Sequence, residues 1–162
     1  MPLGFKFIRG DGCDGNGIRV IPEAGYNRTL IWLHGIGDTA AGWHTLMPLF
    51  GIRRTKFILL TAPIRQVRLD DKIFKPAWHQ IKPSSFPSDN IQDEVEYEKS
   101  QRGLFEESLN RINRIVDSEV QKFGIRPSQI AIGGFEQGGS VALHAAIRSS
   151  HTFSGPLQII SF

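Results

Sequence analysis

The glycine-rich stretch from residue 133 to residue 139 is the feature that most constrains how this chain can fold. It reads GGFEQGG, follows the apolar run Gln129–Ile132 and precedes Ser140–Leu143. This pattern predicts a buried strand, a sharp turn and then a helix. Glycines suit such a corner, because backbone segments pass there too closely for side chains. The residue at the centre of the predicted turn is Glu136.

Alternating strand and helix patterns around this corner predict a parallel α/β sheet. The continuous apolar runs Thr29–His34 and Lys56–Thr61 are typical of strands buried on both faces. From about Glu96 to Phe123, apolar residues recur at three- and four-residue steps, which predicts a helix with one apolar stripe. Gly124 is expected to end that helix. Its charged residues are expected to face away from the sheet: Glu106, Glu107, Arg111, Arg114 and Lys122.

Less regular segments complete a single domain, made of an N-terminal hairpin (residues 1–28) and a larger region (residues 29–162). The expected elements are strands at Leu3–Arg9 and Gly17–Ile21, a short helix from Thr39 to about Phe50, and a last strand at Leu157–Phe162. The proline-rich residues 64–90 have no sustained period and predict a long surface excursion.

Charge and composition narrow the classes of function. The net charge is +3 and the basic residues are scattered, which favours a solvated surface over a specific nucleic-acid site. A single cysteine, Cys13, excludes an internal disulfide framework, and no histidine spacing supports a metal site. Because no apolar run approaches about 20 residues, we expect no transmembrane segment. With no secretory signal pattern, we expect an intracellular protein, cytoplasmic by default, with an organelle such as the mitochondrion left open.

Five blocks of the sequence together resemble the acyl-protein thioesterase/carboxylesterase family, of the phospholipase/carboxylesterase type. They run in the family's order and at its spacing, at Ile31–Thr39, Gly42–Trp43, Thr61–Val67, Pro76–Trp78 and Gly133–Leu143. The resemblance implies an α/β-hydrolase-like fold, with a mostly parallel sheet flanked by helices. It also implies that the last two strands of that fold are lacking.

The same resemblance implies a site for hydrolysis of thioesters and carboxylic esters. The family uses a Ser-Asp-His triad and two backbone N–H groups aimed at the developing oxyanion. The oxyanion-hole donors would be the amides of Ile36 and Gln137, and the serine position of the G-x-S-x-G corner is Glu136. The wall of the substrate pocket would include His34, Trp78 and His79.

Catalytic residues are not expected, because the chain lacks the parts of the triad. No Asp or Glu follows Glu136, and the later histidines are His144, within the predicted helix, and His151, just after it. In this fold the acid and the base belong to later strands. We expect Glu136 to accept hydrogen bonds from the Ile36 and Gln137 amides, which would fill the hole with the protein's own carboxylate.

These observations predict a catalytically inactive thioesterase-like protein that serves as a structural or interaction subunit and needs no cofactor. A protein partner or larger complex is expected to cover the Leu157–Phe162 edge, since exposed apolar strand edges are normally covered. One alternative is a working hydrolase seen as a fragment or completed by another chain. Another is a binder of acyl chains or acylated peptides that uses the old pocket.

Overall fold

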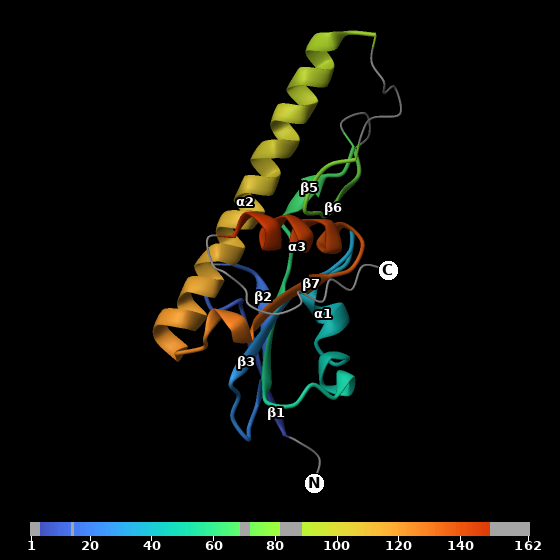
Figure 1. Ribbon diagram of the computed structural model, residues 1–162. Helices are drawn as coiled ribbons and strands as arrows, with labels where there is room; N and C mark the ends of the chain where they lie inside the picture. Colours follow the sequence, from blue (N-terminus) through green and yellow to red (C-terminus); the bar gives the residue numbers. More distant parts are fainter. Residues whose placement is uncertain (1–3, 14, 69–71, 82–88, 150–162) are drawn as a thin grey trace.

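A five-stranded mixed sheet forms the centre of the protein in a computed structural model that describes residues 4–13, 15–68, 72–81 and 89–149 (Figure 1). The strand order is β1-β2-β4-β3-β7, with β4, β3 and β7 parallel and the β1–β2 and β2–β4 pairs antiparallel. The bounds of the strands are Phe5–Arg9 (β1), Gly17–Pro22 (β2), Arg28–Leu33 (β3), Thr55–Leu60 (β4) and Ile130–Gly134 (β7). The predicted hairpin and buried strands are therefore confirmed, whereas Leu157–Phe162 lies outside the described residues.

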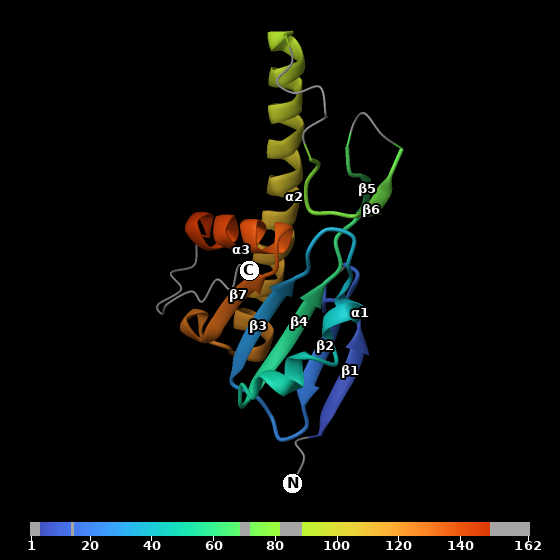
Figure 2. The same cartoon turned by 90° about the vertical axis from the view of Figure 1, so that its right-hand side faces the viewer.

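Helices cover the two faces of this sheet unequally (Figure 2). On one face lie the long helix α2 (Ile91–Phe123) and the helix α3 (Gln137–Arg148), which bury side chains such as Leu109 and Val141 against Ile31. The other face carries only the short helix α1 (Ala40–Trp43) and the 3-10 helix η1 (Met47–Phe50) among the described elements. No helix within the described ranges is both long and apolar enough to span a bilayer.

The prediction of one continuous helix from Thr39 to about Phe50 is wrong. It is divided between α1 and η1, with Pro48 in the first turn of η1. Proline has no N–H to donate and disfavours helical backbone at the residue before it, so it starts a new turn more readily than it continues one. Gly51 then ends η1 in the left-handed conformation, with φ of 67°.

Residues 64–90 contain regular structure that was not predicted. A two-stranded antiparallel hairpin pairs β5 (Ile64–Gln66) with β6 (Phe74–Pro76). Strands of three residues are too short to give a clear alternation in the sequence, which explains why the pattern did not reveal them. After β6 the chain turns inward, and Ala77 and Trp78 are fully buried.

Helix α2 begins five residues before its predicted start. The Asn90 side chain caps it by accepting a hydrogen bond from the Gln92 amide, and Asp93 and Glu94 lie in its first turn, where acidic groups are favoured. Its end at Gly124, with φ of 67°, is confirmed. These first turns extend beyond the sheet (Figure 1), so they lack the apolar stripe on which the prediction depended.

The prediction that Arg111 faces away from the sheet is wrong. Its guanidinium binds the buried Asp11 carboxylate, with Nε 2.9 Å from Oδ2, and donates to the carbonyls of Thr61 and Asn16. The other oxygen of Asp11 accepts hydrogen bonds from the Cys13 and Gly15 amides. Arg111 therefore fastens the β1–β2 loop to α2 and to the end of β4.

Candidate active site at the strand-to-helix corner

The corner between β7 and α3 has the strained backbone expected of a nucleophile position. Glu136 adopts φ of 51° and ψ of −116°, a conformation that L-residues with a side chain rarely adopt. Such conformations cost of order 1–3 kcal/mol and persist where the surrounding structure imposes them. The Phe135 amide, on the strand side of the corner, donates to the Leu33 carbonyl at 2.9 Å, while the Glu136 carbonyl accepts from Ser140 on the helix side.

Two glycines let the start of α3 pack against the backbone of its neighbours. A Cβ atom on Gly138 would lie 2.1 Å from the carbonyl oxygen of Leu33, and one on Gly134 would lie 2.3 Å from the carbonyl carbon of Gly138. Real Cβ atoms essentially never come so close to backbone atoms. The glycine spacing in the sequence therefore reflects the contact between the corner and the end of β3.

The carboxylate of Glu136 occupies one of the two predicted oxyanion-hole donors. The Ile36 amide donates to Oε2 of Glu136 at 2.9 Å. The predicted second bond, from the Gln137 amide, is not formed: within the described ranges, the Glu136 side chain makes no capping bond to α3. The hydrogen bond expected from the Ile36 amide is therefore formed and the one expected from the Gln137 amide is not, while the role of these amides as an oxyanion hole stays a prediction.

Gly35 leaves space for this arrangement. A Cβ atom there would lie 2.7 Å from Oε2 of Glu136 and 3.0 Å from the ring of Phe135. The loop that follows β3 is held separately, since the Asp38 carboxylate accepts from the Thr39 amide and from the indole N–H of Trp43. The donor loop is therefore held by contacts within the protein.

His34 is a structural residue whose two ring nitrogens are both engaged. Its Nε2 accepts a hydrogen bond from the Ala62 amide at 3.0 Å, so Nδ1 carries the proton and donates to the Gly35 carbonyl at 2.6 Å. The side chain is fully buried. Burial lowers the pKa of His34 below its ordinary value of 6.5, although the Gly35 carbonyl and Asp38 oppose this. The neutral ring ties the end of β3 to the end of β4.

The side chain of Gln137, which the sequence did not single out, joins the corner to the loop after β6. Its Oε1 accepts from the Trp78 amide and its Nε2 donates to the His79 carbonyl, both at 3.1 Å. The indole of Trp78 in turn donates to the His34 carbonyl at 2.7 Å. The structure therefore brings Gln137 together with His34, Trp78 and His79, and the role of these last three residues as a pocket wall stays a prediction.

The histidines of the described ranges do not bond to Glu136. His79 bonds to the Gln80 carbonyl through Nδ1 and stacks on Phe105, which also contacts the ring of His144. His151 lies outside the described residues. The chemistry of a triad requires an imidazole within hydrogen-bond reach of the nucleophile. The described corner thus has a carboxylate and a backbone donor but no base.

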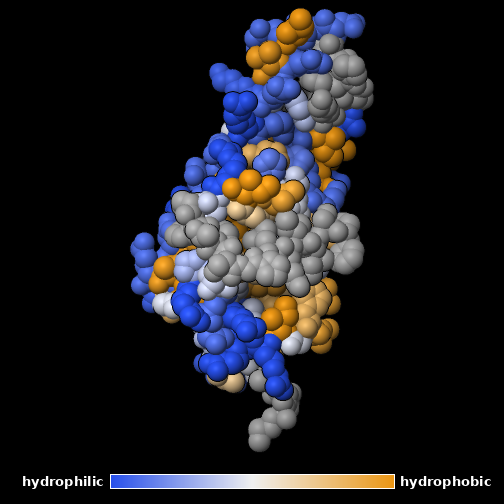
Figure 3. Space-filling view, in the orientation of Figure 1, coloured by the Kyte–Doolittle hydropathy of each residue, from blue (hydrophilic) through white to orange (hydrophobic). Residues whose placement is uncertain are grey.

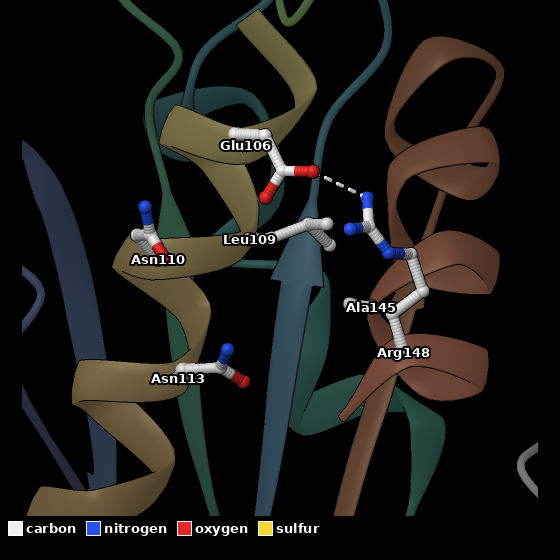
Figure 4. Close-up of a pocket in the computed structure, with 6 residues that line it drawn as sticks. All are labelled: Glu106, Leu109, Asn110, Asn113, Ala145 and Arg148. Atoms are coloured by element: carbon white, nitrogen blue, oxygen red, sulfur yellow. Dashed lines mark hydrogen bonds and ion pairs between the residues drawn. The ribbon is translucent and has the colours of Figure 1, made fainter. Parts of the chain in front are cut away.

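A shallow groove elsewhere on the surface does not belong to this corner (Figure 4). It lies between α2 and α3 and is lined by Glu106, Leu109, Asn110, Asn113, Ala145 and Arg148. An exposed ion pair between Glu106 and Arg148 crosses it. The groove shares no residue with the predicted site, and no group of three or more potential metal ligands occurs in the part of the chain that the structure describes.

Comparison with known sequences relates the chain to one family of hydrolases. Residues 18–162 match the phospholipase/carboxylesterase family. Acyl-protein thioesterase 1 of Saccharomyces cerevisiae is 32% identical over 154 residues, which cover 91% of this chain and 63% of the yeast protein. Acyl-protein thioesterase 1 homolog 1 of Dictyostelium discoideum is 32% identical over 133 residues, covering 80% of this chain and 54% of that protein. The chain thus matches between half and two thirds of the length of these relatives.

Comparison with solved structures supports the same fold. The crystal structure of acyl-protein thioesterase 2 from Zea mays matches with a TM-score of 0.62 and 24% identity, over 82% of this chain and 51% of the maize protein. The structure of SOBER1 from Arabidopsis thaliana matches with a TM-score of 0.57 and 22% identity, over 74% of this chain and 54% of that protein. At these identities the similarity concerns the fold, which is that of the α/β-hydrolases, as predicted.

Proposed function

The chain belongs to the phospholipase/carboxylesterase family, and on that basis we propose that it is a catalytically silent, acyl-protein thioesterase-like protein that acts as a structural or interaction subunit. One observation carries the proposal: the residue at the nucleophile position is Glu136, and its carboxylate accepts the hydrogen bond of the Ile36 amide at 2.9 Å. The donor that would stabilise an oxyanion is therefore already satisfied by the protein itself.

A carboxylate at this position is a poor replacement for serine. Attack on an ester or thioester carbonyl would break its C–O or C–S bond, release the alcohol or thiol, and leave a mixed anhydride between Glu136 and the acyl group. Whichever carboxylate oxygen attacks, Oε2 would also have to leave the Ile36 amide that the new oxyanion needs. Hydrolysis of the anhydride would then need a base to activate water, and no described histidine reaches the corner. The chain after Glu136 supplies no Asp or Glu to orient such a base.

The test is a comparison of the purified chain with its Glu136→Ser variant. Both are incubated with a fluorophosphonate probe and with a p-nitrophenyl ester, and yeast acyl-protein thioesterase 1 serves as the positive control. We expect no labelling of the chain and no turnover above buffer, and no restored turnover in the variant, since a serine alone has no base. Saturable turnover by the unmodified chain that Glu136→Gln abolishes would overturn the proposal.

A second candidate function is a thioesterase or carboxylesterase whose remaining part comes from elsewhere. It is favoured by the length of the relatives, of which this chain matches 63% in yeast and 54% in Dictyostelium. To test it, the chain and its Glu136→Ser variant are each co-expressed with the part of the yeast relative that this chain does not match. Turnover that appears only in such a complex supports this second function over a silent subunit.

A further inference from the structure

Two exposed apolar patches lie at opposite ends of the molecule. The tip patch consists of Ile91 and Val95, on the first two turns of α2, with exposures of 78% and 52%. The base patch consists of Leu49, Phe50 and Ile52, in η1 and the turn before β4, with exposures of 77%, 47% and 42%. Figure 3 shows hydrophobic surface both at the top of α2 and at the lower right, near η1.

Negative charges surround the tip patch. Asp93, Glu96 and Glu98 are exposed on the same turns of α2 as Ile91 and Val95, and the exposed Lys99 directly follows Glu98. In the described part of the chain, neither Glu96 nor Glu98 forms an ion pair; Glu96 accepts only a long hydrogen bond from Gln92. These turns project from the body of the protein (Figures 1 and 2), so a partner can approach them from several sides.

Positive charges surround the base patch. Arg53 and Arg54 directly follow Ile52, and the Arg54 carbonyl accepts from the Arg28 amide at 3.2 Å, which holds Arg28 beside them. All three arginines are exposed, and none of them is in an ion pair with another described residue. Lys122, also exposed, lies in the last turn of α2 at the same end of the molecule, beside the starts of β3 and β4 but across the sheet from η1 (Figure 1).

The two patches cannot meet within one chain. Glu96 and Lys122 lie on one continuous helix, and at a rise of 1.5 Å per residue they are about 39 Å apart. The patches nevertheless match each other, because each has an apolar centre and a charged rim, and the rims have opposite sign. An apolar centre with a rim of complementary charge is typical of protein–protein interfaces.

We propose that the tip patch of one copy docks on the base patch of a second copy of this chain. Ile91 and Val95 pack on Leu49 and Ile52, while the carboxylates at the tip approach the arginines at the base. The contact joins different surfaces of the two copies, so it is a head-to-tail contact. It goes beyond the proposed function and does not depend on it, since neither patch includes Glu136 or Ile36.

Chemical cross-linking of the unmodified 162-residue chain tests the contact directly. A carbodiimide joins carboxylates to lysine amines without a spacer. We expect cross-linked dimers, with Glu96 or Glu98 joined to Lys122 in peptide mass spectra, and such a link cannot form within one helix. The yield should fall in about 0.5 M salt, because salt screens exposed charges. Absence of this link at low salt and high protein concentration would overturn the proposal.

Charge reversal gives an independent test by sedimentation velocity. Glu96→Lys/Glu98→Lys changes the tip and Arg28→Glu/Arg53→Glu changes the base. Arg54 is kept, because its φ of 54° makes substitution there ambiguous. Each double variant alone should associate about tenfold or more weakly, and an equal mixture of the two should regain association. Arg114→Glu, on the exposed middle of α2, is the matched control and should associate like the unmodified chain.

Circular dichroism shows which variants are folded, and where one is not, the cross-link on the unmodified chain decides. Folded variants that associate as strongly as the parent would contradict the proposal. A mixture that stays monomeric while the parent associates would contradict it as well.

Discussion

The positive-φ backbone conformation of Glu136 is imposed by its neighbours and not by its own side chain. The corner is imposed by the contact of Gly138 with Leu33 and by the bond from the Phe135 amide to the Leu33 carbonyl. The carboxylate gains one hydrogen bond from Ile36, at an exposed position where such a bond contributes little. The strain at this residue and the bond that it makes can therefore be separated by substitution.

Glycine and alanine at position 136 should have different effects on stability. Both remove the hydrogen bond to Ile36, but only glycine adopts φ of 51° without strain. Glycine also has the greater conformational entropy in the unfolded chain, which offsets part of this advantage. We therefore expect Glu136→Gly to be more stable than Glu136→Ala by about 1 kcal/mol in urea unfolding. Equal stabilities would mean that the corner relaxes when the glutamate is removed.

Gly138→Ala should be strongly destabilising. The new Cβ would lie 2.1 Å from the Leu33 carbonyl oxygen, so α3 must move away from β3, and we expect a loss of about 3 kcal/mol or more. Gly103→Ala is the matched control in the interior of α2. Apart from the neighbouring backbone of α2 itself, no atom lies within 4 Å of its Cβ position, and alanine there should stabilise by up to about 1 kcal/mol. Similar unfolding midpoints for the two variants would contradict the packing role of Gly138.

His34 should make the protein less stable as the pH falls. Its pKa is lowered by burial in the folded state, so below about pH 6.5 the unfolded chain binds the proton first. The free energy of unfolding should therefore be highest above this pH and decrease as the pH falls from 6.5 through the lowered pKa of the folded protein. The measurement is urea unfolding at several pH values.

The exposed His144 provides the control for that experiment. His144→Gln should keep the pH dependence, whereas His34→Gln should lose the part that arises from position 34, at the cost of a lower stability at every pH. An unchanged slope in a folded His34→Gln variant would show that the buried imidazole does not titrate in this range.

The sequence predicted which residues form the corner, but it did not predict all of their contacts. The positions of Glu136 and Ile36 followed from the resemblance to the thioesterase family, and their contact is confirmed. The Gln137 side chain could not be foreseen, because its partners are backbone groups of Trp78 and His79, about 58 residues away in the chain. Such contacts depend on tertiary packing and leave no local pattern.

At the scale of elements, a buried ion pair ties α2 to the sheet. Nζ of Lys56 on β4 lies 2.6 Å from Glu119, which also accepts from the Thr29 hydroxyl, and both charged side chains are 2% exposed. The ring of Phe123 covers the ammonium at 4.2 Å. The sequence places Lys56 in a buried apolar run, and nothing local indicates that its partner is Glu119, 63 residues later.

Glu119→Gln should therefore cost about 3 kcal/mol, because it leaves the Lys56 charge buried without a counter-charge. Glu107→Gln is the matched control. It breaks the pair with Arg65, in which Glu107 is 58% exposed, and should cost less than about 1 kcal/mol. Adding Lys56→Met to Glu119→Gln should recover most of the loss. Equal costs in urea unfolding for the two single variants would contradict the importance of burial.

The elements that the sequence predicted well are those with long apolar periods. The apolar stripe placed Leu109, Ile112 and Val116 of α2 correctly in the core. It could not place the first turns of the helix, where only the Asn90 cap marks the boundary. The β5–β6 hairpin was missed for a related reason, since its strands have three residues each and little burial.

At the scale of the whole molecule, the N-terminal hairpin completes the core. Strand β2 pairs with β4 over Gly17–Val20 and Phe57–Leu60, and all six residues of β4 are buried. Removal of residues 1–28 would expose this edge and also free Arg111 from Asp11. We expect residues 29–162 alone to lose the cooperative unfolding transition seen by circular dichroism, whereas residues 1–162 should retain it. A cooperative transition in the shortened chain would show that the hairpin is dispensable.

The corner at Glu136 is also a suitable site for attaching a spectroscopic label. Since neighbouring backbone fixes its dihedral angles, whatever side chain is placed there will project at the same spot beside the Ile36 amide. A cysteine introduced at 136, with Cys13 changed to serine, would carry a spin label or a dye to that spot. The labelled protein would report directly whether an acyl chain, a peptide or another protein binds at this corner.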